Sequence, residues 1–337
     1  MLRIPFLLTL YFMGSIIHAS AQQEKRVLII SGGGSRGAWG GGLIKAIHEK
    51  ENPDYRCIVG TSTGSLLAPL AAINAFEKME TGFTDVTQKS IFNVNPFTAS
   101  GEIRTFKAVL RVIFGKQNLG ETENLRTRIL SFFTQQDFDT LRLTGRTVKV
   151  SVTSLTSNRV AYMSTDDNTY QNMVDWIWAS ANQPIFMSTL VKNNERWVDG
   201  GLKENVPIAE GLRYARAHGI KTADVVVNNI EGVQPKPWPV SNGKTNVIPK
   251  LLRVIDIFSD EVRLSDIENG ILEAQVSDMV INLYFMSAED FALSPNPLLF
   301  QHPILTELWR RGYSHMLTAP KTLIQRKIGN NNIINMR

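Results

Sequence analysis

Two short apolar runs, each followed closely by a glycine-rich loop, constrain the fold of this chain more than any other feature. The runs span residues 26–30 and 56–59, and their length and composition are typical of buried strands. Stretches with helical character follow them, up to about residue 50 and over residues 65–74. The order strand, loop, helix, strand, helix predicts a parallel sheet covered by helices.

The rest of the chain continues this alternation less regularly. We expect helices over residues 101–116, 122–133, 168–180 and 207–218, and strands over residues 147–153, 159–164, 197–198 and 224–228. Residues 231–246 contain three prolines and two glycines, which predicts a linker. After the linker we expect a helix over residues 247–264, a strand over residues 279–285 and a helical C-terminal segment. The predicted organisation is one α/β domain over residues 22–230 and a mostly helical extension over residues 231–337, packed on that domain.

Composition excludes several kinds of protein. Of the 337 residues, 43% are hydrophobic and 20% are charged, which is typical of a globular chain and not of a disordered one. Cys57 is the only cysteine, so an intramolecular disulfide is impossible and a cysteine-built metal site is not expected. The formal net charge is +5, without a block of basic residues interleaved with aromatic ones, so no nucleic-acid partner is indicated.

The N-terminus has the pattern of a secretory signal. Arg3 supplies a positive charge, residues 4–17 are mostly apolar, and Ala19 and Ala21 are the small residues that a signal peptidase recognises. We expect residues 1–21 to be a signal peptide; the alternative is an uncleaved anchor, and no cysteine follows to carry a lipid. The protein is then expected to be exported, to the periplasm, to the outer membrane or out of the cell.

The loop after the first predicted strand is Gly32-Gly33-Gly34-Ser35-Arg36-Gly37. It satisfies the G-x-G-x-x-G pattern of a dinucleotide site, but the acid expected about 20 residues further on is replaced by Gly60-Thr61. The Gly-Lys-Ser/Thr of a phosphate-binding P-loop is also absent. We therefore expect no nucleotide cofactor. A loop of exposed backbone N–H groups at a helix N-terminus remains, and it suits a developing negative charge.

The second loop, Gly60-Thr61-Ser62-Thr63-Gly64, matches G-x-S-x-G between a strand and a helix. This is the context of a nucleophile elbow, a tight turn that exposes the serine oxygen at the helix N-terminus. Ser35 lies in a second match to the pattern, but it directly follows three glycines and is less suited to a rigid position. A helix cap is the alternative role for Ser62.

A nucleophilic serine needs a base. The histidines outside the predicted signal are His48, His218, His302 and His315. His48 falls inside the first predicted helix and His218 at the end of another, and no acidic or glycine-rich motif surrounds His302 or His315. Asp199-Gly200-Gly201, in contrast, ends a predicted strand, and its glycines permit a sharp turn that brings the aspartate over the edge of the sheet. A plain turn aspartate is the alternative interpretation.

Taken together, these motifs resemble the patatin-like phospholipase family, in its bacterial, exported form. The glycine loop, the elbow and Asp-Gly-Gly occur in the family's order and spacing, and the resemblance covers roughly Lys25 to Asn228. Residues 179–186 look like the family's Ala-Ser…Pro…Phe segment, and Asn205 and Pro207 follow Asp-Gly-Gly as in the family. The resemblance implies a patatin-like three-layer α/β/α fold with a mostly parallel central sheet, and a catalytic domain over residues 22–230.

The resemblance also implies the chemistry. Ser62 would be the nucleophile, Asp199 the proton acceptor, and Gly33 and Gly34 the oxyanion-hole residues, while Arg36 would steady the loop or meet a phosphate. The remaining motif glycines are Gly32, Gly37, Gly60, Gly64, Gly200 and Gly201. The substrate would be a lipid ester at a membrane or micelle surface, with no metal, organic cofactor or protein partner required. The alternatives are a Ser–His–Asp esterase that uses His302 or His218, and a non-catalytic lipid-binding protein.

One segment of the predicted helix over residues 101–116 has two interpretations. Apolar residues repeat at helical spacing from Ile103 to Phe114, and basic residues lie among them. We expect a helix that faces the core and keeps its basic side in solvent. The alternative is a helix that lies on a membrane surface or covers an apolar site.

Overall fold

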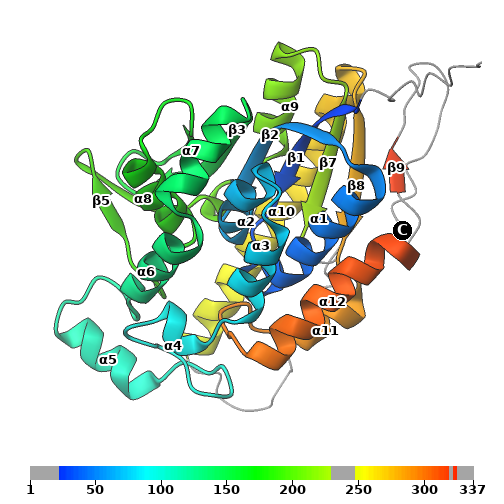
Figure 1. The fold of residues 1–337 in the computed structure, drawn as a ribbon. Helices are drawn as coiled ribbons and strands as arrows, with labels where there is room; N and C mark the ends of the chain where they lie inside the picture. Colours follow the sequence, from blue (N-terminus) through cyan, green and yellow to red (C-terminus); the bar gives the residue numbers. More distant parts are fainter. Residues whose placement is uncertain (1–22, 229–246, 319–321, 325–337) are drawn as a thin grey trace, which may run out of the picture.

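A twisted central sheet organises the molecule (Figure 1). The computed structural model describes residues 23–228, 247–318 and 322–324. The strands in this part of the chain are β1 (Lys25–Ile30), β2 (Asp54–Thr61), β3 (Thr147–Ser154), β4 (Arg159–Ser164), β5 (Leu190–Lys192), β6 (Glu195–Asp199), β7 (Thr222–Val227), β8 (Val280–Phe285) and β9 (Thr322–Ile324). The order is β5-β6-β3-β2-β1-β7-β8-β9, with β4 paired to β3. The five strands from β3 to β8 are mutually parallel, and the outer pairs are antiparallel.

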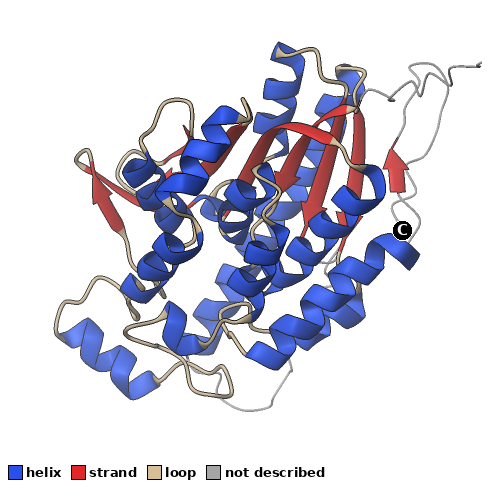
Figure 2. Cartoon of the chain, viewed as in Figure 1, coloured by secondary structure: helices blue, strands red, loops and turns tan. Residues whose placement is uncertain are grey.

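Helices cover both faces of the sheet and complete three layers (Figure 2). One face carries α1 (Gly37–Glu51), α2 (Thr63–Ala72), α3 (Phe76–Thr84), α6 (Glu123–Phe132), α7 (Gln135–Leu143), α8 (Tyr170–Ser180) and α12 (His302–Thr318). The other carries α9 (Ile208–Ala217) and α10 (Val247–Val276). The shorter helices α4 (Gln88–Ile91), α5 (Thr105–Ile113) and α11 (Ala288–Leu293) lie in the connections. The predicted α/β/α fold with a mostly parallel sheet is confirmed.

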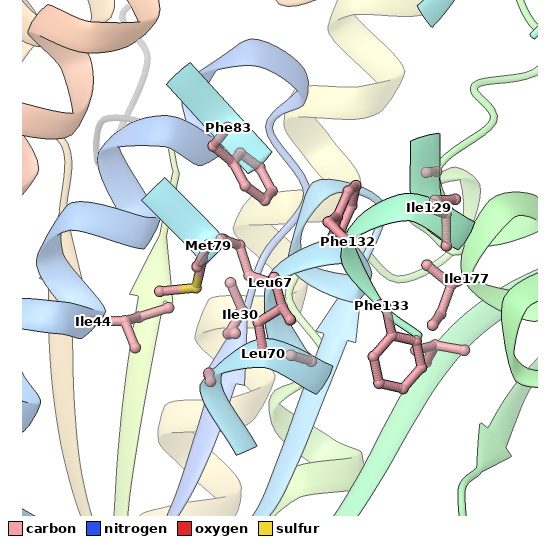
Figure 3. Packing of buried hydrophobic residues seen from close by; sticks show 14 of the residues in the cluster. Ile30, Ile44, Leu67, Leu70, Met79, Phe83, Ile129, Phe132, Phe133 and Ile177 are labelled. Atoms are coloured by element: carbon pink, nitrogen blue, oxygen red, sulfur yellow. The ribbon is translucent and has the colours of Figure 1, made fainter. Parts of the chain in front are cut away.

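Alternation along β1 explains why the sheet is buried on both sides. Leu28 and Ile30 belong to the larger apolar cluster, which also contains Leu67 and Met79 (Figure 3). Val27 and Ile29 belong to the second cluster, below α9 and α10. Successive side chains of a strand point to opposite faces, so an unbroken apolar run fills both cores.

The chain after residue 247 is part of the same sheet and the same core. Strand β8 pairs in parallel with β7, and α12 packs along α1. The two helices approach so closely that a Cβ atom on Gly42 would collide with the carbonyl oxygen of Trp309, and one on Gly312 with that of Trp39. This contact accounts for glycines inside α1, where each is less favourable than alanine by about 1 kcal/mol. The predicted linker over residues 231–246 lies outside the described residues.

The orientation predicted for the 101–116 helix is wrong. The helix is shorter, from Thr105 to Ile113, and none of its residues is buried. Phe106 and Ile113 are 77% and 69% exposed. The periodic pattern correctly predicts an amphipathic helix, but its apolar side faces away from the core.

Candidate active site

Ser62 occupies the sharp turn between β2 and α2. Its backbone has φ 55° and ψ −121°, an unusual conformation for a residue other than glycine. The crossing is so tight that a Cβ atom on Gly60 would collide with the carbonyl oxygen of Gly64. Two hydrogen bonds hold the turn: the Ser62 N–H donates to Ser180 Oγ at 3.0 Å, and the Ser65 hydroxyl donates to the Ser62 carbonyl at 2.6 Å. This geometry is that of a nucleophile elbow.

Asp199 ends β6 and turns its carboxyl group toward Ser62. Its Oδ1 accepts a 2.7 Å hydrogen bond from the Gly201 N–H, and its own N–H donates to the Asn182 carbonyl at 3.0 Å. Burial raises the pKa of Asp199 to about 7, although hydrogen bonds from the Ser62 hydroxyl and the Gly201 N–H act in the opposite direction. A pKa near 7 is the range expected of a general base that works at neutral pH.

The glycine loop lies beside both groups. The Gly32 N–H donates to the Asn205 carbonyl at 3.1 Å, and the Ser35 N–H donates to the Pro297 carbonyl at 2.8 Å. Between these anchors, Gly33 and Gly34 line the cavity that holds Ser62. Within the described part of the chain, no acceptor pairs with the N–H group of either glycine. Both N–H groups are therefore candidate donors to a negatively charged oxygen in the cavity.

The two other candidate residues of the loop have different surroundings. Ser35 is buried, and its hydroxyl lies 2.7 Å from the Ser294 hydroxyl, so it is not available as a nucleophile. The Arg36 Nε donates to the Ser294 carbonyl at 3.0 Å, and the guanidinium lies 3.8 Å from the centre of the Phe291 ring. Burial, together with the nearby Arg263, lowers the pKa of Arg36 to about 9. Arg36 therefore joins the glycine loop to the segment before α12.

The motif glycines Gly37, Gly200 and Gly201 all occupy junctions around the site. Gly37 begins α1, while Gly200 and Gly201 form a 3₁₀ turn directly after β6. The structure therefore brings the two loops and the Asp-Gly-Gly turn to one place, as the sequence predicts.

No histidine lines this cavity in the part of the chain that the structure describes. His302 is exposed, with Nδ1 2.7 Å from the Thr84 carbonyl oxygen. His218 is also exposed and stacks on the Tyr214 ring at 3.9 Å. His48 packs beside Phe76, and His315 lies edge-on to Trp39. The structure brings none of the four to Ser62.

The cavity around Ser62 and Asp199 has a volume of about 390 Å³. One wall is apolar and is formed by Phe83, Val86, Leu125, Phe132, Leu298 and Leu305. Charged side chains of α10 line another part, namely Arg253, Asp256, Asp260 and Arg263. A site of this size, with an apolar wall beside charged side chains, can accommodate a flexible apolar chain next to Ser62.

Asp266 of α10 is a site residue that sequence reasoning missed. Its Oδ2 accepts hydrogen bonds from the N–H groups of Asn205 and Val206, at 2.7 and 2.9 Å. Because the Asn205 carbonyl accepts from the Gly32 N–H, this carboxylate supports the glycine loop through one intermediate residue. Burial raises the pKa of Asp266 to about 7. No motif in the sequence marks it, since its partners lie some 60 residues away.

Comparisons with known proteins show which family this chain resembles. The probable lipid hydrolase 463L of Invertebrate iridescent virus 6 is 21% identical over 204 residues, which cover 60% of this chain and 68% of that protein. The crystal structure of VipD from Legionella pneumophila is 13% identical and covers 90% of this chain and 68% of that one, with a TM-score of 0.45. A family profile described as patatin-like phospholipase matches residues 28–212, more than half of the chain. The glycine loop, the elbow and the Asp-Gly-Gly turn all fall within that match, and the chain belongs to the patatin-like phospholipase family of lipid acyl hydrolases.

Proposed function

We propose that this protein is a serine hydrolase that cleaves acyl esters of lipids through a Ser62–Asp199 dyad. The observation that carries the proposal is the buried contact between the Ser62 hydroxyl and the Asp199 carboxyl, whose pKa is raised to about 7. A carboxylate of ordinary pKa, near 4, is a poor base for a hydroxyl group. Burial in the cavity removes this mismatch without a histidine.

In the first half of the reaction, the Ser62 oxygen attacks the ester carbonyl carbon and its proton passes to Asp199. The negative charge that develops on the carbonyl oxygen is held by the N–H groups of Gly33 and Gly34. Each such donor contributes on the order of 3 kcal/mol to transition-state stabilisation. The tetrahedral intermediate then collapses, the bond to the leaving alcohol breaks, and Asp199 returns the proton to that alcohol.

In the second half, water releases the acyl group from Ser62. Asp199, again ionised, accepts a proton from the water, and the water oxygen attacks the acyl-enzyme carbonyl. When the bond to the Ser62 oxygen breaks, the proton moves from Asp199 to that oxygen, and a fatty acid leaves. The same two donors of the glycine loop serve both tetrahedral intermediates.

A phospholipid or lysophospholipid is the substrate class that we favour among lipid esters. The apolar wall of the cavity accommodates an acyl chain, and the charged side chains of α10 provide polar contacts beyond the reacting carbonyl. The activity would then be of the phospholipase A or lysophospholipase type.

A second proposal concerns where the protein is located. We infer from the pattern of residues 1–21 that the protein is exported, with cleavage after Ala21. These residues lie outside the described part of the chain. Mass spectrometry of the protein recovered from its native host, with Gln22 expected as the first residue, tests this inference.

A fluorophosphonate probe tests the proposed dyad directly. We expect labelling at Ser62, and loss of both labelling and fatty-acid release in Ser62→Ala, by at least about 10³-fold in activity. His302→Ala and His218→Ala serve as controls and should each lower activity by less than about tenfold, the low end for the loss of a general base. A large loss in either histidine variant with normal folding would favour a Ser–His–Asp esterase. Normal folding without labelling or activity on a panel of lipid esters would favour a non-catalytic lipid-binding protein.

A further inference from the structure

Helix α5 presents an apolar face to solvent. We call this surface the α5 face; it consists of Phe106, Val109, Val112, Ile113 and Phe114. Their exposed fractions are 77%, 46%, 68%, 69% and 74%. Single exposed apolar residues are ordinary on a protein surface, but five that cluster on one short helix and its C-terminal cap indicate an interaction site.

One polar side chain of α5, Arg111, ties the helix to the rest of the protein. The Arg111 guanidinium donates to the Asn118 carbonyl at 2.7 Å and to Glu121 at 2.7 Å. Just before the helix, Arg104 Nε donates to the Phe97 carbonyl at 2.6 Å. A surface helix of a globular protein normally buries its apolar side and exposes its polar side. In α5 the largest apolar side chains are exposed instead, and the half-buried residues are Ala108, Leu110 and Arg111.

The charge around the α5 face indicates which kind of surface it binds. Residues 103–117 contain four basic residues, Arg104, Lys107, Arg111 and Lys116, and no acidic residue. Lys107 and Lys116 are exposed beside the apolar side chains. Apolar residues with basic residues next to them are typical of helices that lie in the interface of an anionic bilayer. No helix in the described part of the chain combines the length and the apolar character needed to cross a membrane.

The segment that carries α5 is attached to the rim of the Ser62 cavity at two points. After α5, the Leu119 N–H donates to the carbonyl of Ile185, a cavity residue, at 2.7 Å. Before it, the Gly101 carbonyl accepts from Asn296 Nδ2 at 2.8 Å, next to the cavity residue Pro297. In Figure 1, α5 lies at the end of the molecule toward which β1 and β7 point. The α5 face is therefore on the side of the fold where the strands deliver the catalytic residues.

We propose that the α5 face docks the protein on anionic lipid bilayers and places the cavity at the lipid surface. The apolar side chains enter the interface between headgroups and acyl chains, and Lys107 and Lys116 contact anionic headgroups. The benefit for catalysis rests on the proposed lipid-ester hydrolysis, but the docking itself does not require a reaction. Vesicle binding can thus be measured in the inactive Ser62→Ala protein.

The test compares sedimentation with vesicles of phosphatidylcholine alone and of phosphatidylcholine with 30 mol% phosphatidylglycerol, a composition chosen for the experiment at roughly physiological anionic content. In the Ser62→Ala background we expect stronger binding to the anionic vesicles, weakened as salt shortens the screening length below about 10 Å. Phe106→Ser with Ile113→Ser should reduce this binding about tenfold or more. Leu143→Ser with Val276→Ser is the matched control, because these residues are 89% and 84% exposed away from α5.

A second variant separates docking from folding. Lys107→Glu with Lys116→Glu leaves the apolar residues in place and should reduce binding to anionic vesicles while preserving the melting temperature. With Ser62 intact, both α5 variants should keep hydrolysis of a short soluble ester and lose activity on vesicles. Unchanged vesicle binding in the α5 variants would overturn the proposal. An equal loss of binding in the Leu143 and Val276 control would also overturn it. Failure of soluble-ester hydrolysis in the unaltered protein would count against the dyad alone.

Discussion

The N–H group of Gly201 donates a 2.7 Å hydrogen bond to Oδ1 of Asp199, two residues before it in the chain. The turn that contains the two glycines thereby fixes the carboxyl group, which also accepts a hydrogen bond from the Ser62 hydroxyl. Burial still dominates the electrostatics, because the pKa of Asp199 rises to about 7 despite this bond. The turn controls the position of the base, and the surrounding cavity controls its basicity.

The rate of ester hydrolysis should follow the ionisation of Asp199. A protonated carboxyl group cannot accept the Ser62 proton, so kcat/KM on a short soluble ester should rise with pH and level off above about pH 7. Asp266 also has a pKa of about 7, so Asp266→Asn is the control. If the inflection disappears in that variant and activity persists at low pH, the titrating group is not Asp199.

Asp199→Asn should abolish activity and stabilise the fold at neutral and higher pH. A carboxyl group with a folded-state pKa raised above 3.8 favours folding at low pH, and this contribution is lost as pH rises through about 7. The amide carries no charge, so the gain in unfolding free energy should be on the order of 1–3 kcal/mol at pH 8. Denaturant melts at pH 8 and pH 4 check this, because the difference between variant and parent should shrink toward pH 4. A destabilised variant at pH 8 would contradict the assigned burial.

The two serines of the G-x-S-x-G matches should respond differently to alanine. Ser35→Ala leaves the Ser294 hydroxyl without its 2.7 Å partner, which should lower the unfolding free energy by about 1–3 kcal/mol. Its activity and probe labelling should persist, because the Ser35 hydroxyl is buried and hydrogen-bonded to the Ser294 hydroxyl. Loss of labelling in Ser35→Ala, with retention in Ser62→Ala, would mean that the elbow has been assigned to the wrong loop.

Asp266→Ala should lower kcat more than it raises KM. The change removes the acceptor for the N–H groups of Asn205 and Val206, so the Asn205 carbonyl that holds Gly32 can shift. A displacement of about 1 Å in a catalytic group can cost on the order of a hundredfold in rate. Asp266→Asn retains a carbonyl oxygen at the same place and should restore most of the activity. Equal activity of the alanine and asparagine variants, at equal stability, would remove the positioning role.

The fold and the proximity of Ser62 and Asp199 could be predicted from the sequence, because both depend on local patterns. Successive side chains of the apolar run before Gly32 point into two different cores. The tight turn at Ser62 depends on the glycines next to it in the sequence. The orientation of α5 could not be predicted, since periodicity identifies an apolar side without saying what covers it. Arg111 of α5 is bonded to Glu121, which lies outside the helix, and the sequence of the helix does not predict that contact. The role of Asp266 could not be predicted for the same reason, because its hydrogen-bond donors are backbone N–H groups that lie far from it in the sequence.

The close approach of α1 and α12 has a consequence for comparing this chain with its relatives. Gly42 and Gly312 are small because each faces backbone of the opposite helix, and α1 starts where the glycine loop ends. A larger residue at either position would push the helices apart and tilt α1, the helix that directly follows the glycine loop. Among homologues these positions should therefore vary jointly, and a relative with alanine or a larger residue at the first should lack the final helix or place it elsewhere. The family profile stops at residue 212 and so does not include Gly312. The covariation would therefore reveal a helix contact that the profile does not describe.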